Sequence, residues 1–367
     1  VYKRQGCGGG RPRGGRGGGG CRGGAGVRQR RCVDALNAAL HGAFERREDV
    51  YLIGEDLLDP YGGAFKVGAG LSSRWPERVI TTPISEASLF GVAAGMAVRG
   101  YRPVLEIMFG DFLALGFDQI VNGISKFREM YDDQVDVPLV VRAPMGGRRG
   151  YGPTHSQSLE KFLLGVPNIT VVATSEVHDL EALLTEAIED DEPVFFIENK
   201  VMYGRANRRP VDGRLEGLQV VEGAGPYPSL TFSGNDFEES EATIVAHGGM
   251  APFALEAAVE LIVEHEIFCE VVVPSRLLPL DIDPIVDSVS RSGTLVTAEE
   301  GSLTAGVGAE IAAQVQERAC EVLRGPVRRV AAADGIIPSA PGLEAATWPG
   351  TAQVIDAVLV RQVARAA

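Results

Sequence analysis

The sequence feature that most constrains the fold is an alternation of short apolar runs with longer segments of helical spacing. Strands that are apolar along most of their length are buried on both faces, and such strands, separated by helices, are typical of a parallel sheet with helices on both sides. The predicted strands of the first half are residues 50–56, 77–82, 102–109, 137–144, 169–174 and 193–200. The predicted helices are residues 33–46, 88–99, 114–131, 158–165 and 177–190.

The second half repeats this alternation after an interruption. Residues 204–240 are rich in Gly, Pro and charged side chains, so we interpret them as a linker between domains. Apolar runs and helical segments then alternate again, up to a last helical segment at 351–366. The sequence therefore predicts an α/β protein of two tandem domains with mainly parallel sheets flanked by helices, at residues 27–203 and 241–367.

The first 26 residues differ from the rest of the chain. Half of them are Gly, Arg is the next most frequent residue, and apolar side chains are nearly absent. A segment of this composition buries too little apolar surface to form a core. We predict that residues 1–26 are a disordered or non-native extension; an Arg/Gly-rich RNA-binding tail is the alternative.

Composition excludes several functional classes for the remainder. The chain has 367 residues and a net charge of −14 without a basic face in its body, which argues against nucleic-acid binding. No apolar run reaches the roughly 18 residues of a membrane helix. The five Cys residues lack the paired spacing of zinc sites and disulfide frameworks, which favours a reducing compartment. We expect a bacterial cytoplasmic protein rather than a mitochondrial matrix one, because the start lacks a Ser-rich amphipathic presequence.

A single acid, Glu86, stands at the start of an apolar helical segment. Residues 80–100 pass from a strand-like run to a helix built largely from Gly, Ala and Val. An acid in the first turn of a helix is stabilised by the helix dipole, and Ser85 or Thr82 could cap this helix. The functional alternative is a carboxyl group buried among small residues, which needs a partner or a proton because burying its charge is costly.

Two further stretches carry candidate site residues. His155 follows a Gly- and Arg-rich loop, 146–153, that could hold an anion or a reactive intermediate; a surface or capping histidine is the alternative. Phe109 and Phe112 follow a predicted strand, where open α/β sheets bind ligands, and they could stack on a cofactor ring or pack in the core. The glycines after Thr304 lack the third Gly and the acid of a dinucleotide fingerprint, so we reject a nicotinamide site.

Five stretches, taken in order, resemble one family closely. The chain is similar to the β subunits of thiamine-diphosphate-dependent 2-oxoacid dehydrogenases, which include pyruvate, branched-chain 2-oxoacid and acetoin dehydrogenases. The resemblance covers residues 33–364 and implies a transketolase-like pyrimidine-binding domain followed by a transketolase C-terminal domain. The stretches are GEDLLDPYGGAFKVGAGL (54–71), RVITTPISEA (78–87), RPVLEIMFGDFLALGFDQIVN (102–122), GPTHSQSLE (152–160) and AIEDDEPVFFIENKVMYG (187–204).

The resemblance implies roles for individual residues. Glu86 matches the glutamate that shares a proton with the pyrimidine ring of thiamine diphosphate, which favours the imino form that activates the thiazolium ring. Glu55 matches an acid near the cofactor, and His155 matches a histidine at the active-site mouth that handles the acyl group on its way to lipoamide. Residues that line the cofactor ring are matched by Ile84, Met108 and Phe112. A potassium site made mostly of backbone carbonyls is matched by Leu139, Ala187, Ile188, Asp190 and Glu192.

The diphosphate-binding signature of thiamine enzymes, Gly-Asp-Gly with a downstream Asn, is not found in this sequence. A diphosphate needs a metal ion and hydrogen-bond donors to offset its charge. The resemblance therefore implies that a separate α subunit holds Mg²⁺ and the diphosphate, and that the active site lies at an α/β interface in an α2β2 assembly. The expected function is oxidative decarboxylation of a 2-oxoacid, of pyruvate or branched-chain type, with acyl transfer to the lipoyl domain of a dihydrolipoyl acyltransferase.

Two alternatives stand beside this function. The chain could be the C-terminal half of a split transketolase-type enzyme, which transfers ketol units without a lipoyl protein. It could also be a non-catalytic scaffold subunit, although intact Glu86 and His155 argue against that hypothesis. Arg148 and Arg149 add a basic element near His155 that could bind a substrate carboxylate or the phosphate of a carrier.

Overall fold

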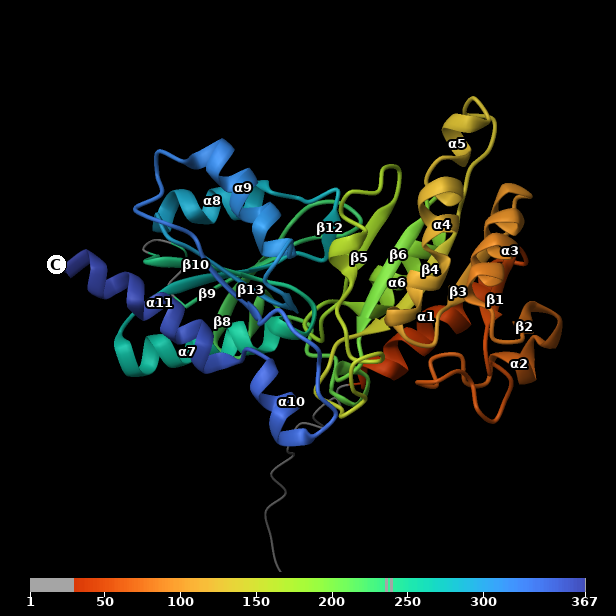
Figure 1. The fold of residues 1–367 in the computed structure, drawn as a ribbon, viewed down its shortest axis with the longest axis horizontal. Coiled ribbons are helices and arrows are strands. Elements are labelled where there is room, and N and C mark those ends of the chain that lie inside the picture. Colours follow the sequence, from red (N-terminus) through yellow and green to blue (C-terminus); the bar gives the residue numbers. More distant parts are fainter. Residues whose placement is uncertain (1–29, 235–236, 238–239, 367) are drawn as a thin grey trace, which may run out of the picture.

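Two seven-stranded sheets, one formed mainly by each half of the chain, organise the protein (Figure 1). The computed structural model describes residues 30–234, 237 and 240–366, so the extension predicted at residues 1–26 lies outside the described residues. The prediction of an α/β fold with two mainly parallel sheets is confirmed. No helix in the described part of the chain is both long and apolar enough to cross a membrane.

The first sheet is built from residues 50–199 and one later strand. Its own strands are β1 (Val50–Gly54), β2 (Val79–Thr81), β3 (Arg102–Glu106), β4 (Val140–Met145), β5 (Thr170–Ala173) and β6 (Val194–Asn199). All of these pair in parallel, in the order β5-β6-β4-β3-β1-β2. The helices and turns are α1 (Cys32–Arg46), α2 (Leu71–Arg74), η1 (Pro76–Arg78), α3 (Glu86–Val98), η2 (Gly110–Gly116), α4 (Phe117–Gln119), η3 (Ile120–Ile124), α5 (Phe127–Met130), η4 (Glu160–Phe162), α6 (Leu180–Glu189) and η5 (Met202–Gly204).

Helices cover both faces of this sheet, which explains why its strands are apolar along their length. Apolar residues of α1 and α6 pack on one face, and those of α3 pack on the other. Along β3, for example, Val104 belongs to the apolar cluster that includes α1 and α6, and Leu105 belongs to the cluster that includes α3. The alternation follows from strand geometry, in which successive side chains lie on opposite faces.

Two helix predictions in this half were wrong. The segment 114–131 is not one helix: the π-helical turn η3 follows α4, and Ser125 donates a hydrogen bond to the Val121 carbonyl at 3.0 Å, a contact that bends helices. The segment 158–165 forms only the short turn η4, because Gly165 and Pro167 follow it closely and prevent a longer helix.

The second sheet combines a parallel part with an antiparallel edge. Its order is β14-β13-β10-β11-β9-β8-β7, and β9, β8 and β7 are antiparallel to their neighbours. The strands are β7 (Arg214–Leu215), β8 (Leu218–Glu222), β9 (Leu230–Ser233), β10 (Ala242–Ala246), β11 (Cys269–Val273), β13 (Leu295–Ser302) and β14 (Arg328–Ala332). The helices are η6 (Gly248–Met250), α7 (Ala251–His265), α8 (Asp283–Ser292), α9 (Val307–Ala319), α10 (Pro341–Thr347) and α11 (Thr351–Ala366).

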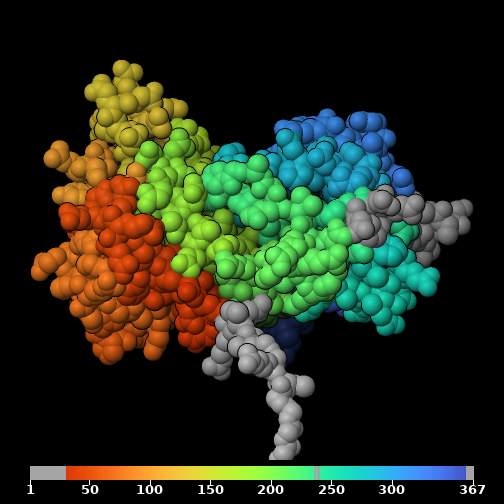
Figure 2. All heavy atoms as spheres, turned by 180° about the vertical axis from the view of Figure 1, so that it is seen from behind, coloured from red at the N-terminus to blue at the C-terminus, as the bar shows by residue number. Residues whose placement is uncertain are grey.

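The interpretation of residues 204–240 as a linker needs correction. Residues 214–233 form β7, β8 and β9, and Leu218, Leu230 and Phe232 are buried in the core of the second half. Short strands at the edge of a sheet tolerate Gly, Pro and charge on their exposed side, so composition alone resembles that of a linker. In Figure 2 the green part of the chain, which includes this segment, lies on the near face between the red-to-orange and the teal-to-blue parts.

The two halves are joined by more than a chain connection. Strand β12 (Arg276–Leu278) belongs to the second half in sequence but pairs antiparallel with β5 at the edge of the first sheet (Figure 1). One apolar cluster also continues from Val171 in β5 through Leu277 in β12 to Ile285 in α8. The halves therefore share a core, and the loop after β4 and the end of β6 both contact β13 at the seam between them.

Candidate active site

The candidate residues lie at the carboxyl ends of neighbouring parallel strands. Glu86 follows β2, Glu55 follows β1, Met108 and Phe112 follow β3, and His155 follows β4. Because β4, β3, β1 and β2 are adjacent in the sheet, these residues share one edge of it. This is the edge at which open α/β sheets bind ligands.

Glu55 and Glu86 form a buried pair of acids at this edge. Each is only 5% exposed. Burial raises the pKa of Glu55, the charge of Glu86 raises it further, and the backbone amide of Ser85 acts in the opposite direction. Oε1 of Glu55 is buried and has no hydrogen-bond partner among the described residues. The pair therefore offers an unused proton-accepting atom at the surface where a ligand would bind.

Glu86 lies in the first turn of α3, as the helix-dipole interpretation expects, but the predicted capping by Ser85 is not found. Glu86 is the first residue of α3, and the side chain of the N-cap residue, Ser85, makes no capping hydrogen bond. One face of α3 packs on the sheet, but the helix is not buried all round, because Val92 is 53% exposed. Ile84, the predicted ring-lining residue before α3, is 75% exposed. The structure of the single chain thus leaves apolar side chains at the surface beside the buried acids.

His155 lies against an aromatic cluster. Its ring packs edge-on against Phe109, with centroids 4.7 Å apart, and against Phe112, with centroids 5.2 Å apart. Phe109 also contacts Tyr151 and Phe65, at 5.6 Å in both cases. Two of the predicted site residues, His155 and Phe112, are therefore in contact in the structure. Met108, one position before Phe109, is partly buried.

One hydrogen bond orients the imidazole of His155. Its Nδ1 lies 2.8 Å from Oγ1 of Thr154, and among the described residues Nε2 has no hydrogen-bond partner. The residue is only partly buried, so Nε2 is available to a molecule that enters from outside. A half-exposed imidazole with one nitrogen held and the other free is suited to proton transfer.

The loop before His155 is fixed to the second half of the chain. Arg148 pairs with Glu300 of β13 at 3.2 Å and lies 4.4 Å from the ring centroid of Phe253. The backbone amides of Arg149 and Gly150 donate to the carboxylate of Glu344 in α10. The side chain of Arg148 is therefore engaged within the protein, whereas Arg149 is exposed and donates one hydrogen bond, from Nη1 to the Lys200 carbonyl.

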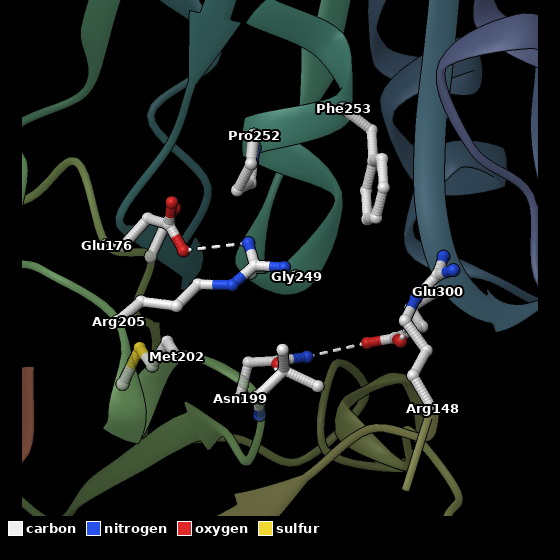
Figure 3. A pocket seen from close by; sticks show the side chains of 12 residues that line it. Arg148, Glu176, Asn199, Met202, Arg205, Gly249, Pro252, Phe253 and Glu300 are labelled. Atoms are coloured by element: carbon white, nitrogen blue, oxygen red, sulfur yellow. Dashed lines mark hydrogen bonds and ion pairs between the residues drawn. The ribbon is translucent and has the colours of Figure 1, made fainter. Parts of the chain in front are cut away.

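The seam beside this loop contains a small polar pocket. Figure 3 shows Arg205 paired with Glu176 on one side of it and Asn199 paired with Glu300 on the other, with Phe253 lying nearby. The Arg205–Glu176 distance is 3.0 Å and the Asn199–Glu300 distance is 2.6 Å. The cavity volume is about 10 Å³, so it holds no more than a water molecule and is not a cofactor site.

Three of the five carbonyls expected to bind potassium already accept hydrogen bonds within the protein. Nη1 of Arg102 donates to the carbonyls of Ile188 and Asp190, at 3.0 and 2.7 Å. The carbonyl of Leu139 accepts the amide of Val194 at 2.8 Å. The other two predicted ligands are Ala187, which is buried in α6, and Glu192, whose side chain pairs with Arg128. A guanidinium is therefore the cation at two of these carbonyls, and the residues as arranged do not fit a potassium ion.

Comparison with known proteins agrees with this geometry. Residues 29–205 match the family described as transketolase, pyrimidine binding domain, and residues 235–354 match transketolase, C-terminal domain. A pyruvate dehydrogenase E1 component subunit beta from Leifsonia xyli is 38% identical over 89% of this chain and 93% of its own length. The chain belongs to the β-subunit family of thiamine-diphosphate-dependent 2-oxoacid dehydrogenases.

Other members of this β-subunit family and one solved structure extend the comparison. The acetoin:2,6-dichlorophenolindophenol oxidoreductase subunit beta of Cupriavidus necator is 35% identical over 88% of this chain and 94% of its own length. A solved structure described as a split gene transketolase, inactive beta4 tetramer, matches with a TM-score of 0.68 and 25% identity over 89% of this chain and 96% of that chain. The family resemblance and the two-domain fold predicted from sequence are confirmed.

Sequence reasoning missed several residues that this β-subunit fold brings to the site. Phe65 and Tyr151 join the aromatic cluster, and Lys200, which follows β6, contacts His155. Lys200 ends the last predicted strand of the first half, so its place at the edge with the other site residues could have been expected from strand order. Its burial could not, because a lysine at a strand end is ordinarily exposed.

Proposed function

We propose that the chain is the catalytic β subunit of a 2-oxoacid dehydrogenase. It oxidatively decarboxylates a 2-oxoacid of pyruvate or branched-chain type and passes the acyl group to lipoamide, together with a separate α subunit in an α2β2 assembly. The observation that carries the proposal is the buried pair of Glu55 and Glu86 at the ligand-binding edge of the first sheet. The names of the relatives, which include β subunits of pyruvate and acetoin enzymes, support the same reaction class.

The residues at this edge fit thiamine diphosphate as the cofactor. Glu86 would accept a hydrogen bond from the pyrimidine ring, and the unpartnered Oε1 of Glu55 marks buried polar space beside it. Phe112 and Met108 are partly exposed at the same edge and would line the ring, with Ile84 completing the lining when a partner covers it. When bound, the cofactor supplies a carbon nucleophile that the protein itself lacks. The role of Glu86 is to exchange one proton with the cofactor ring.

The exposed apolar side chains around Glu86 support a partner subunit. Ile84 is 75% exposed, Val92 53%, Leu115 59% and Tyr61 51%. These residues belong to segments that follow β1, β2 and β3 or lie on α3, and exposed apolar side chains that group together mark interaction surfaces. An α subunit that carries Mg²⁺ and the diphosphate-binding groups would cover them and close the site from water.

His155 is proposed to serve acyl transfer to the lipoyl domain of a dihydrolipoyl acyltransferase. Its Nε2, which has no hydrogen-bond partner among the described residues, can donate a proton to, or accept one from, a carrier thiol. Phe109 and Phe112 keep the ring in one orientation by edge contacts. Potassium is not part of the proposal, because Arg102 occupies two of the carbonyls concerned.

Reconstitution tests the proposal. The chain is co-expressed with candidate α chains, and the purified complex is assayed with thiamine diphosphate and Mg²⁺ for dichlorophenolindophenol reduction by pyruvate, branched-chain 2-oxoacids and acetoin. We expect 2-oxoacid-dependent dye reduction by the complex and none by either chain alone. Ketol transfer between sugar phosphates would instead support the split-transketolase alternative, which the structural neighbour makes worth testing. Turnover by this chain without a partner would contradict the α2β2 proposal.

A further inference from the structure

Lys200 is a buried ammonium that the proposed function does not use. Its side chain is 0% exposed, although lysine is among the residue types least often buried. Nζ donates a hydrogen bond to the backbone carbonyl of His155 at 2.8 Å and lies 5.4 Å from the centroid of the Phe109 ring. The two contacts are to the candidate catalytic residue and to the aromatic ring that packs against its imidazole.

Lys200 also holds the other end of the histidine loop. Its backbone carbonyl accepts a hydrogen bond from Nη1 of Arg149 at 3.1 Å, and its amide donates to the carbonyl of Met145, the last residue of β4, at 2.9 Å. Both ends of the loop 146–155 therefore lie next to Lys200. Lys200, just after β6, thus contacts the strand before the loop through Met145, the start of the loop through Arg149 and the end of the loop at His155.

The ammonium has no ion-pair partner among the described residues. A buried charge without a directly paired carboxylate destabilises a fold, and an apolar side chain of similar length would remove that penalty. Stability alone therefore does not account for a lysine at this position. The hydrogen bond to His155 and the contact with the face of Phe109 are what a methionine there would lack.

We propose that Lys200 is a positioning residue for His155: its ammonium holds the His155 backbone beside Phe109 and so fixes the imidazole for acyl transfer to the lipoyl carrier. The inference rests on the proposed function. It assigns Lys200 to the second half of the reaction and leaves the decarboxylation step to the residues around Glu86.

The protonation state of Lys200 gives this role a pH dependence. Burial lowers the pKa of Lys200 to about 8, against the opposing effect of the nearby acids. The charged and titratable groups that face it are Asp111 of η2, Arg149 and His155 of the loop, Glu300 of β13 and Glu344 of α10. A neutral amine loses the attraction to the Phe109 ring and donates a weaker hydrogen bond. Acyl transfer is therefore expected to fall as pH rises through this pKa.

The reconstituted holoenzyme with the Lys200→Met substitution tests the role. We expect kcat/KM for a lipoylated lipoyl domain to fall at least about tenfold, because loss of positioning misplaces His155. Dye reduction by the 2-oxoacid is expected to stay within about twofold of wild type, since it does not need the carrier. The alkaline decline of acyl transfer is expected to be lost in the variant. Hydrogen exchange of the peptide 146–155 is expected to quicken.

The Tm of Lys200→Met distinguishes a positioning role from a structural one, because a structural role predicts a lower Tm. The depressed pKa means that the folded protein binds the proton less tightly than the unfolded one, so charged Lys200 lowers stability at neutral pH. Lys200→Met is therefore expected to leave Tm unchanged or to raise it. The matched control is Lys161→Met, because Lys161 donates to Ser302 at 2.6 Å and to the Thr304 carbonyl at 2.8 Å across the same seam without contacting the loop.

The outcomes separate the inference from the proposed function. A wild-type holoenzyme that is inactive in both assays overturns the proposed function. An active wild type whose Lys200→Met variant acylates the lipoyl domain normally overturns the assignment of Lys200. Equal loss in both assays with a lowered Tm also overturns it, because a general structural role predicts that result. Selective loss of acyl transfer in Lys200→Met and not in Lys161→Met supports it.

Discussion

The charge of Glu86, at the start of α3, raises the pKa of Glu55, at the end of β1, and both carboxyl groups are buried. Burial is the larger cause of the raised pKa and the charge of Glu86 the second, and both favour the protonated form of Glu55. The sequence places them 31 positions apart, and the pairing of β1 with β2 brings them together. The proposed function requires Glu86 to exchange a proton with the cofactor ring at this edge, with Glu55 as its acidic neighbour.

Glu86→Gln is expected to abolish turnover without unfolding the chain. The amide keeps the shape of the side chain but cannot exchange a proton with the cofactor ring, so kcat for 2-oxoacid-dependent dye reduction should fall by about 100-fold or more. Steady-state assays of the reconstituted complex measure the effect. The control is Glu77→Gln, an exposed acid in the adjacent turn η1, which should keep wild-type activity. Wild-type turnover by Glu86→Gln would favour the scaffold alternative.

Glu55→Gln is expected to stabilise the fold at neutral pH. A carboxyl group whose pKa is raised in the folded state holds its proton more tightly there than in the unfolded chain, so its contribution to stability is lost as pH rises through the raised pKa. The variant should unfold at higher urea than wild type at about pH 7.5, and at the same urea at about pH 4. A variant less stable than wild type at the higher pH would show that Glu55 has a stabilising partner.

Arg142→Met is expected to be severely destabilising. The guanidinium donates to both carboxylate oxygens of Glu198 at 2.7 Å and to Glu106 at 2.5 Å, and all three residues are almost fully buried in the first sheet. Removing the cation leaves two buried acids unpaired, at a loss of about 3–5 kcal/mol in the free energy of unfolding.

Urea unfolding of Arg142→Met and of a control variant measures this difference. The control is Arg318→Met, which breaks an exposed pair with Asp283 and should change the free energy of unfolding by less than about 1 kcal/mol. Equal effects of the two substitutions would contradict the buried network as the stabilising element.

Potassium is expected to have no specific effect. Because Arg102 already donates to the carbonyls of Ile188 and Asp190, Tm should be the same in KCl and NaCl of equal ionic strength. Differential scanning calorimetry in the two salts makes the comparison. A higher Tm in KCl alone would show that the ion displaces the guanidinium and that the family site is retained.

The architecture and half of the site could be predicted because they depend on local pattern. Alternating apolar runs predict parallel strands, and the position of Phe112 after one of them predicts a ligand-binding edge. The resemblance to the β-subunit family implied that Glu55, Glu86 and His155 belong to the same site, and the strand order of the structure places them at that edge. Edge strands are different. Residues 214–233 have too few apolar positions to stand out, and their pairing depends on β11, which comes later in the chain.

The sequence by itself determined the two-domain α/β fold and the edge at which the site forms, because hydrophobic periodicity decides which segments are buried and in what conformation. Tertiary structure alone decided the crossing of β12 to the first sheet, the placement of Arg102 on the carbonyls of Ile188 and Asp190, and the burial of Lys200 beneath His155. These contacts join residues 45 to more than 100 positions apart. Their energies depend on geometry and local hydration, which no linear pattern encodes.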